Sequence, residues 1–243
     1  MGVAKPKGTD ERILRELSES RSDDKPRFER SPLPYPKKFD EGIDRFVEAV
    51  KIAVSGEPER AREIVEAIDH EGMVKWYDET AQHVGSVRLS MFGGKAGKRS
   101  SGGKRDMRLT RVRRIAARDG YLCGYCDIRV IEPEILKKID TMLGGGVLHK
   151  RSTPRNNRSY HGIWLMTAVT LDHIEPLAKN HDDSDENLVT CCWSCNFGKY
   201  HYELVELGLR APVSNRGRST GWVGARDVLG ARQYPERLGP AYS

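Results

Sequence analysis

The sequence predicts an α+β protein in which a small helical domain precedes a mixed domain stapled by four cysteines. Apolar residues recur at helical spacing between residues 39 and 90. After residue 163, β-branched and aromatic residues gather in two strand-like runs. Two Cys-x-x-Cys pairs bracket those runs, and such pairs favour one shared metal site over separate roles for the thiols.

The N-terminal part of the chain divides into an arm, a helical domain and a linker. Residues 1–38 are polar, charged and rich in proline, which predicts an extended or disordered arm. Three helical patterns between residues 39 and 90 predict a small helical domain that packs, binds a protein partner or self-associates. Residues 91–108 are mainly glycine, serine and basic residues, which is typical of a flexible linker.

Positive charge is concentrated around this linker. The chain has a formal net charge of +6, and residues 95–114 alone carry nine basic residues against one acid, Asp106. Such a run is suited to phosphate contacts, although a solvated face is the common alternative. The residues expected to contact nucleic acid here are Lys104, Arg105, Arg108, Arg111 and Arg114.

Membrane and secretory classes find no support in the sequence. No stretch approaches the ~18 consecutive apolar residues of a membrane span, and the first residues lack the apolar core of a secretion signal. A cytoplasmic location is the default expectation. Five cysteines, four of them in short pairs, fit zinc in a reducing compartment better than a disulfide framework.

The second half of the chain alternates helical and strand patterns. We expect helices at 110–118 and 133–143, strands at 163–174 and 188–190, and a helix at 196–207 that ends at Gly208. These elements form a predicted domain of residues 109–208. Residues 209–243 show no motif and predict an irregular tail.

The two cysteine pairs predict a structural zinc site. Cys123 and Cys126 form the first pair, and Cys192 and Cys195 form the second. Four thiolates fill the tetrahedral sphere that structural zinc prefers, so this ion would hold structure and leave no open position for substrate. Cys191 is left over because Cys192 has the better spacing to Cys195, and we expect a small buried side chain or a spare thiol there.

Four polar residues, Asp172, His173, Asn187 and Asn196, fall between the cysteine pairs or just after them. They belong to the segments Asp172-His173-Ile174, Asn187-Leu188 and Cys195-Asn196-Phe-Gly-Lys199. Together with the cysteine pairs, these segments resemble the HNH endonucleases, a family with a ββα-metal fold. The resemblance covers residues 110–208, with its motif core at 171–199. It implies that the second domain is a ββα-metal nuclease core stapled by the zinc site.

The resemblance also implies roles for single residues. His173 corresponds to the general base that takes a proton from the attacking water. Asp172 and Asn196 correspond to ligands of a catalytic divalent ion, and an oxygen-rich set of this kind favours Mg²⁺ or Mn²⁺. Asn187 corresponds to the residue that braces the loop. Lys199 is expected to contact phosphate, with a solvent-facing helix lysine as the alternative.

The function implied is that of a metal-dependent HNH endonuclease that hydrolyses DNA, with RNA as an alternative substrate. Two rival interpretations remain at this stage. One is a catalytically inactive, zinc-stabilised module that binds nucleic acid, and the other is a scaffold or toxin-like subunit that uses residues 39–90 to bind a partner. The presence of Asp172, His173 and Asn196 together favours the enzyme.

Overall fold

A computed structural model describes residues 32–33, 35–81, 108–150, 159–212, 221–226 and 229. Residues 1–31, most of the linker and most of the C-terminal tail therefore lie outside the described part of the chain. The same is true of Lys104 and Arg105, two of the residues expected to contact nucleic acid.

Helices make up the described part of the N-terminal half. They are α2 (Lys38–Val54), α3 (Pro58–Glu66), α4 (His70–Trp76) and the π-helical turn η1 (Tyr77–Ala81). Helix α2 buries Phe39, Phe46 and Val50, whose spacing places them on one face. Helix α4 begins where the carboxylate of Asp69 accepts a hydrogen bond from the backbone N–H of Gly72 at 2.9 Å.

The second half combines short helices with one β-hairpin. Its described elements are α6 (Leu109–Arg118), α7 (Pro133–Met142), α8 (Gly162–Thr167), β1 (Val169–His173), α9 (Leu177–Asn180), β2 (Leu188–Cys192), α10 (Trp193–Lys199) and α11 (Leu204–Leu207). The expected helices near 110–118 and 133–143 are present, and the α+β class is confirmed.

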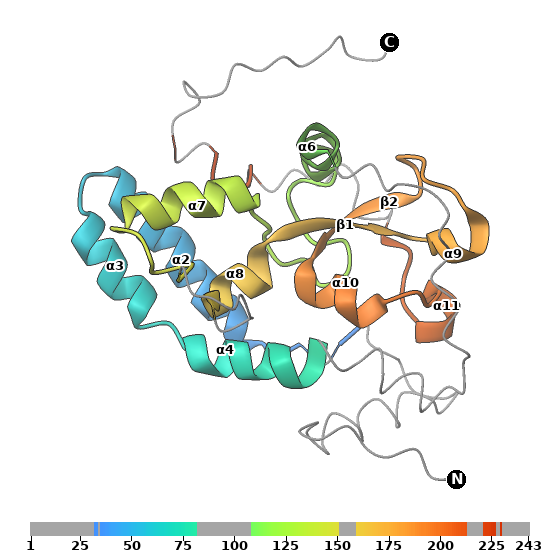
Figure 1. The fold of residues 1–243 in the computed structure, drawn as a ribbon, viewed down its shortest axis with the longest axis horizontal. Helices are drawn as coiled ribbons and strands as arrows, with labels where there is room; N and C mark the ends of the chain where they lie inside the picture. The colour runs from blue at the N-terminus through green and yellow to red at the C-terminus, as the bar shows by residue number, and fades with distance from the viewer. Residues whose placement is uncertain are drawn as a thin grey trace.

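The hairpin and the helix that follows it form the centre of this half. Strands β1 and β2 are antiparallel, with Val169 opposite Cys192 and His173 opposite Leu188. Helix α10 begins directly after β2 and packs against both strands. Figure 1 shows α10 on one side of the hairpin and α6 on the other. The order strand, strand, helix is the ββα arrangement that the resemblance implies.

Two predicted elements are wrong in their extent. The strand expected over 163–174 is divided, because its first part folds as helix α8 and only Val169–His173 is a strand. All six residues of α8 are buried, so no alternation of apolar and polar residues separates helix from strand in this run. The helix expected over 196–207 ends at Lys199. Tyr200 has a φ of 56°, a value outside the right-handed helical region.

The N-terminal helices pack closely on the second half of the chain. Helix α4 approaches α8 at Gly162, where a Cβ atom would lie 2.3 Å from the Cβ of Met73. The backbone N–H of Gly162 donates to Nδ1 of His70 at 3.0 Å, and the ring of His70 stacks on that of His161 with centroids 4.7 Å apart. His161 in turn caps α8, since its Nδ1 accepts from the N–H of Ile163 at 3.2 Å.

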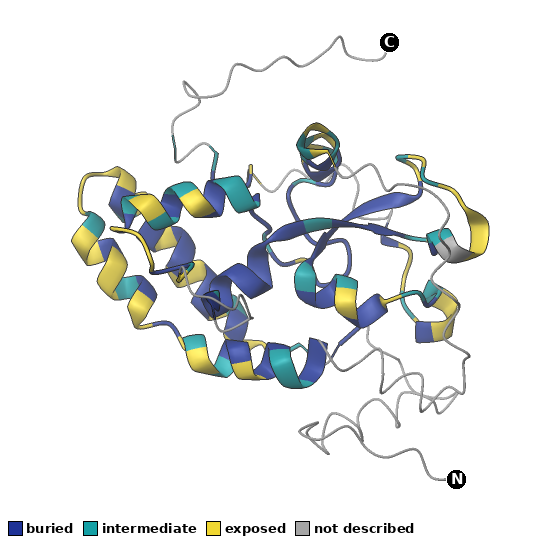
Figure 2. Cartoon of the chain, in the orientation of Figure 1, coloured by how far each residue is buried: buried dark blue, intermediate teal, exposed yellow. Residues whose placement is uncertain are grey.

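One hydrophobic core therefore joins the described N-terminal helices to the hairpin. Figure 2 shows buried residues on the inner faces of α2 and α4 and through α8 into the strands. The division into domains at 39–90 and 109–208 stays a prediction.

Part of the predicted tail returns to the core. Glu132 is fully buried, and it forms ion pairs with Arg113 at 2.7 Å and with Arg226 at 2.6 Å. Trp222 donates its indole N–H to the backbone oxygen of Val130 at 3.2 Å. Residues 221–226 are thus tied to the segment between α6 and α7.

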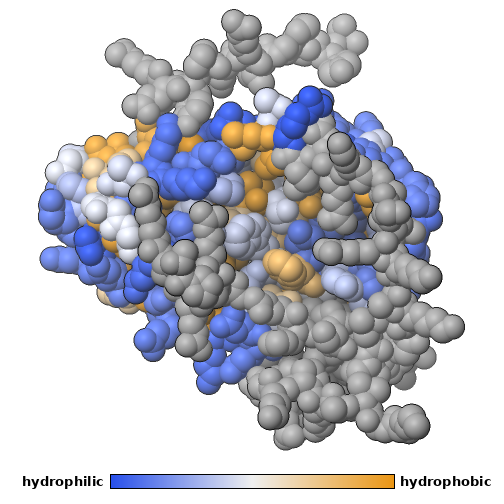
Figure 3. All heavy atoms as spheres, viewed as in Figure 1, coloured by the Kyte–Doolittle hydropathy of each residue, from blue (hydrophilic) through white to orange (hydrophobic). Residues whose placement is uncertain are grey.

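The visible surface is mainly polar. Figure 3 shows hydrophilic residues over most of the coloured face, with hydrophobic residues in separate patches. Within the described residues, no helix combines the length and apolar character that crossing a bilayer requires.

Candidate active site

Four cysteine sulfurs form a compact, buried cage. The Sγ atoms of Cys123, Cys126, Cys192 and Cys195 all lie within 4.8 Å of one another, and those of Cys126 and Cys192 are 3.9 Å apart. Zinc bound tetrahedrally through bonds of about 2.3 Å holds its sulfur ligands roughly 3.8 Å apart. The cage therefore has the donor set and the dimensions of a structural zinc site.

The local fold brings the two cysteine pairs together. Gly124, inside the first pair, packs so closely on β2 that a Cβ atom would lie 2.4 Å from a methyl group of Val189. Cys192 is the last residue of β2 and also the N-cap of α10, where its sulfur accepts from the N–H of Cys195 at 3.5 Å. A strand end and a helix start thus share one cage residue.

The thiols of the cage need a compensating cation to ionise together. Burial raises the pKa of Cys126 and of Cys195 well above the usual thiol value. Burial acts upward on Cys123 as well, but hydrogen bonds from the neighbouring thiols bring its pKa well below that value. Cys191 stays outside the cage and donates to the backbone oxygen of Cys192 at 3.2 Å, in agreement with the spare, buried thiol that we expected.

Asp172 lies on β1 between the first cysteine pair and α10. The residue is 7% exposed, and its Oδ2 atom accepts from the hydroxyl of Tyr125 at 2.6 Å and pairs with the ammonium of Lys199 at 3.1 Å. Burial raises the pKa of Asp172, and the charge of Lys199 and the Tyr125 hydrogen bond offset only part of that rise. Both contacts use Oδ2, so Oδ1 has no partner among the described residues.

Lys199 is an internal residue. Its side chain is fully buried, and its ammonium donates to the backbone oxygen of His173 at 2.7 Å in addition to pairing with Asp172. The phosphate contact expected of Lys199 is therefore wrong for this structure, and so is its alternative of a solvent-facing lysine. The ammonium instead ties α10 to the end of β1.

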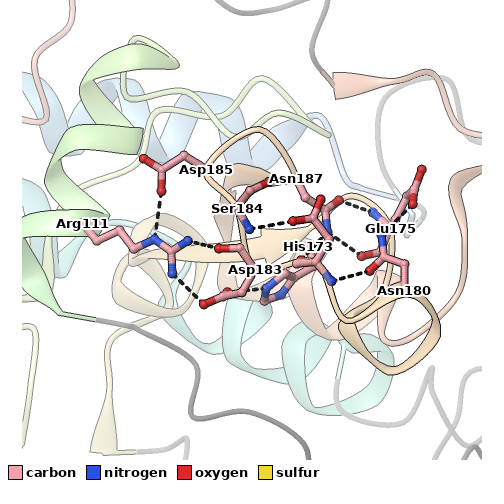
Figure 4. Close-up of polar contacts among 9 residues, drawn as sticks. Arg111, His173, Glu175, Asn180, Asp183, Ser184, Asp185 and Asn187 are labelled. Carbon is pink, nitrogen blue, oxygen red and sulfur yellow. Dashed lines mark hydrogen bonds and ion pairs between the residues drawn. The ribbon is translucent and has the colours of Figure 1, made fainter.

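His173 faces a different set of partners from its neighbour Asp172, as alternation along a strand requires. Its Nε2 atom lies 2.8 Å from Oδ1 of Asp183. The other carboxylate oxygen of Asp183 accepts from Nη1 of Arg111 at 2.9 Å, and Nη2 of Arg111 donates to the backbone oxygen of Asp183. Figure 4 shows Asp183 between the Arg111 guanidinium and the His173 ring.

Electrostatics favour an ionised Asp183. Burial alone would raise the pKa of this carboxyl group, but the hydrogen bonds from His173 and Arg111 lower it below its usual value. Arg111 also donates through Nε to Asp185 at 3.0 Å. The loop between β1 and β2 therefore presents a carboxylate to His173 that is itself held by α6.

Asn187 braces this loop through its side-chain amide. Its Oδ1 accepts from the backbone N–H of Glu175 at 2.8 Å, and its Nδ2 donates to the backbone oxygens of Glu175 and Asp182 at 3.0 Å and 2.8 Å. These three hydrogen bonds join the segment after β1 to the segment before β2. The carboxylate of Glu175 accepts from Asn180 at 2.6 Å within the same loop.

Asn196 lies one turn before Lys199 on α10 and directly after Cys195. Side chains three residues apart on a helix are neighbours, so Asn196 projects on the side of α10 where Lys199 meets Asp172. The side chain of Asn196 is half-buried, whereas that of Lys199 is fully enclosed. Helix α10 thus places Asn196 one turn before Lys199, and among the described residues no hydrogen bond joins its amide to Asp172.

A search with protein-family models identifies this region. The model described as HNH endonuclease matches residues 157–201. Residues 157–201 are an HNH endonuclease domain. Neither a search of curated proteins nor a search of solved structures finds a match to the chain.

The HNH endonuclease domain contains Asp172, His173, Asn187 and Asn196 as well as the second cysteine pair. The first cysteine pair completes the cage from outside the matched range. The resemblance stated from the motifs is confirmed, as is the ββα arrangement with its four-cysteine cluster. Membership of this family implies a nucleic-acid substrate.

The basic residues beside the HNH domain are only partly available to such a substrate. Arg111 has a side chain that is 10% exposed and occupied by Asp183 and Asp185, so the structure does not present it to a phosphate as we expected. Arg114 is 62% exposed while it pairs with Asp185 at 2.5 Å. Arg108, at the start of α6, is exposed.

The residue that sequence reasoning missed in the HNH domain is Asp183. Its signal was present as the acidic segment 182–186 between the two halves of the motif, ten residues beyond His173. A run of exposed acids is normally solvated, and only the folded loop shows which of these carboxylates turns back to the histidine.

Proposed function

We propose that this protein is a metal-dependent HNH endonuclease that hydrolyses DNA phosphodiester bonds. The observation that supports the proposal most directly is the state of His173 inside the matched domain. One ring nitrogen is held by Asp183, and the other, Nδ1, has no hydrogen-bonding partner among the described residues. A histidine held in this way can accept a proton at Nδ1.

Asp172 and Asn196 are the proposed ligands of the catalytic divalent ion. The free Oδ1 atom of Asp172 and the half-buried amide of Asn196 supply oxygen donors, which fit Mg²⁺ or Mn²⁺ better than a second zinc. When bound, the ion would supply positive charge to the scissile phosphate and to the departing 3′ oxygen. Tyr125 and Lys199 hold the other carboxylate oxygen and so fix the direction of the proposed ligand.

In this mechanism His173 removes a proton from the attacking water. Its backbone oxygen is bound by Lys199 and its Nε2 by Asp183, so both the main chain and the ring are held in place. Asn187 contributes indirectly because it braces the loop that carries Asp183. A positioned base of this kind contributes roughly 10²–10⁴-fold to rate in enzymes generally.

DNA is proposed as the substrate from charge and from family. The net charge of +6 and the basic run at 95–114 would supply affinity for phosphates that does not depend on sequence. Of the basic residues that we expected to bind, Arg108 and Arg114 are described and exposed, and Lys104 and Arg105 belong to the same run. Residues 1–90 are proposed to modulate targeting or assembly.

The direct test is cleavage of supercoiled plasmid and of single-stranded DNA by zinc-loaded protein, with magnesium, with manganese and without added divalent ion. His173→Ala should abolish cleavage without loss of DNA binding. His181→Asn is the matched control, because His181 is an exposed histidine of the same loop with a φ of 58°, where asparagine is tolerated. Cleavage by His173→Ala at the wild-type rate would overturn the assigned base.

The same experiment separates the enzyme from the inactive module. A protein that binds DNA and retains zinc but cuts neither substrate with either ion would be a nucleic-acid-binding module built on the nuclease fold.

A further inference from the structure

An aspartate that is not one of the four motif residues Asp172, His173, Asn187 and Asn196 contacts the proposed base directly. Oδ1 of Asp183 lies 2.8 Å from Nε2 of His173, and the histidine is 5% exposed. The carboxylate comes from the loop between the strands, ten residues after the histidine. Figure 4 shows the Asp183 carboxylate directed at the His173 ring from this loop.

We propose that Asp183 is a positioning residue that keeps the imidazole of His173 protonated at Nε2 and leaves Nδ1 free to accept the proton of the attacking water. The consequence for catalysis rests on the proposed function, whereas the protonation pattern of the ring does not. In this proposal Asp183 acts through His173 and has no direct role toward the substrate or the ion.

The chemistry follows from what each group can donate. An ionised carboxylate only accepts hydrogen bonds, so a contact at 2.8 Å requires the hydrogen on Nε2 of His173. Nδ1 then carries the lone pair. When the O–H bond of the water breaks, its proton moves to Nδ1, the oxygen forms a bond to phosphorus, and the bond from phosphorus to the 3′ oxygen breaks. The departing oxygen takes a proton from solvent, and the positive charge on the ring lies beside the Asp183 carboxylate.

Arg111 gives the carboxylate a fixed position. Its guanidinium binds Oδ2 of Asp183 at 2.9 Å and also the backbone oxygen of the same residue, so side chain and main chain are held together. The arginine side chain is 10% exposed, which separates this contact from an ordinary surface ion pair. Since Arg111 belongs to α6 and His173 to β1, the arrangement links two elements that are far apart in the sequence.

The test compares Asp183→Asn with Asp182→Asn in the full-length, zinc-loaded protein. Asp182 is a matched control because it belongs to the same loop and is exposed, and its side chain accepts from the N–H of Ser184 rather than from His173. Both changes remove one negative charge. Asparagine at position 182 can still accept the Ser184 hydrogen bond.

The first measurement is the position of the ring proton of His173, read from the long-range ¹H–¹⁵N correlation spectrum of the imidazole at neutral pH. Assignment uses His173→Ala, in which the His173 signals are absent. The wild-type and Asp182→Asn proteins should show the Nε2-protonated form, and Asp183→Asn should show a mixture of the two forms. A wild-type ring protonated mainly at Nδ1 would overturn the proposal.

The second measurement is the split between kcat and KM for plasmid cleavage. Asp183→Asn should lower kcat by about 10–100-fold with little change in KM, because part of the contribution of a positioned base is lost. Asp182→Asn should stay within about twofold of wild type, and Asp183→Glu should recover part of the lost rate, as a retained carboxylate predicts. Equal kcat values for Asp183→Asn and Asp182→Asn would overturn the positioning role.

The two measurements separate the two proposals. If the protein cuts no DNA but the ring signals change in Asp183→Asn as expected, the proposed function fails and the positioning of His173 by Asp183 stands. If cleavage is normal and the ring signals do not respond to Asp183→Asn, the positioning proposal fails alone.

Discussion

Replacing His161 by asparagine tests how the burial of one imidazole makes folding depend on pH. His161 is 7% exposed and stacks on His70, and burial lowers its pKa from 6.5 to about 3. In the unfolded chain the side chain regains its ordinary value near ~6.5. Asparagine can still cap α8 by accepting from the N–H of Ile163, so the change removes the titrating ring and keeps the cap.

The magnitude follows from proton linkage. Because the folded pKa is lower than the unfolded pKa, the stability associated with His161 is present above pH 6.5 and is lost as the pH falls below it. Each pH unit in this window changes the free energy of unfolding by about 1.36 kcal/mol. The contribution of His161 to the unfolding free energy of the wild-type protein should therefore fall by about 2 kcal/mol between pH 6.5 and pH 5. Burial also lowers the pKa of His70, which is retained in both proteins and acts in the same direction.

The assay is urea denaturation at pH 7 and pH 5, followed by tryptophan fluorescence, for wild type, His161→Asn and His181→Asn. Protonation of the cysteine cage affects all three proteins alike and cancels in the differences. His161→Asn should be less stable than wild type at pH 7 because a packed ring is lost, and this deficit should shrink by about 2 kcal/mol at pH 5. His181→Asn, a change at an exposed position, should follow the wild-type pH dependence. An equal deficit of His161→Asn at both pH values would refute the reasoning.

Two further predictions concern the cage and the buried lysine. Cys195→Ser should lower both the zinc content, measured by metal analysis of the purified protein, and the unfolding temperature, whereas Cys191→Ser should retain one zinc per chain because its sulfur lies outside the cage. Lys199→Met should lower the unfolding free energy in urea by about 3–5 kcal/mol, because it leaves the buried Asp172 carboxylate without its cation. The double variant Lys199→Met with Asp172→Asn should lose less unfolding free energy than Lys199→Met alone. An equal or larger loss of unfolding free energy would contradict this account.

Features that depend on short spacing could be predicted from the sequence. The cysteine cage is one, since Cys123 and Cys126 share a turn and Cys192 and Cys195 share another, and tetrahedral zinc accepts four such thiolates. Helix α6 is another, since its apolar side recurs at helical spacing and its end is followed by Gly120 with a φ of 67°. The ββα order followed from the resemblance in the same segment.

Features that depend on residues far apart in the sequence could not be predicted from the sequence. The sequence predicts a strand where α8 forms because a run that is buried on all sides carries no periodic signal. His161, which caps α8, is also stacked on His70 of the N-terminal helices. Lys199 looked like a surface residue until the fold placed its ammonium beside Asp172. The sequence does not show that Asp183 contacts both Arg111 and His173, because these contacts form only in the folded loop.

Asn196 follows Cys195 directly, so a single peptide bond joins the sulfur cage to the proposed ligand of the second ion. Binding of the proposed second ion should therefore depend on an intact cage. If zinc is extracted, the first turn of α10 loses its anchor and the amide of Asn196 moves with it, even in excess magnesium. Reconstitution of a stripped protein should then have an obligatory order, with zinc first and magnesium second, and magnesium alone should restore nothing.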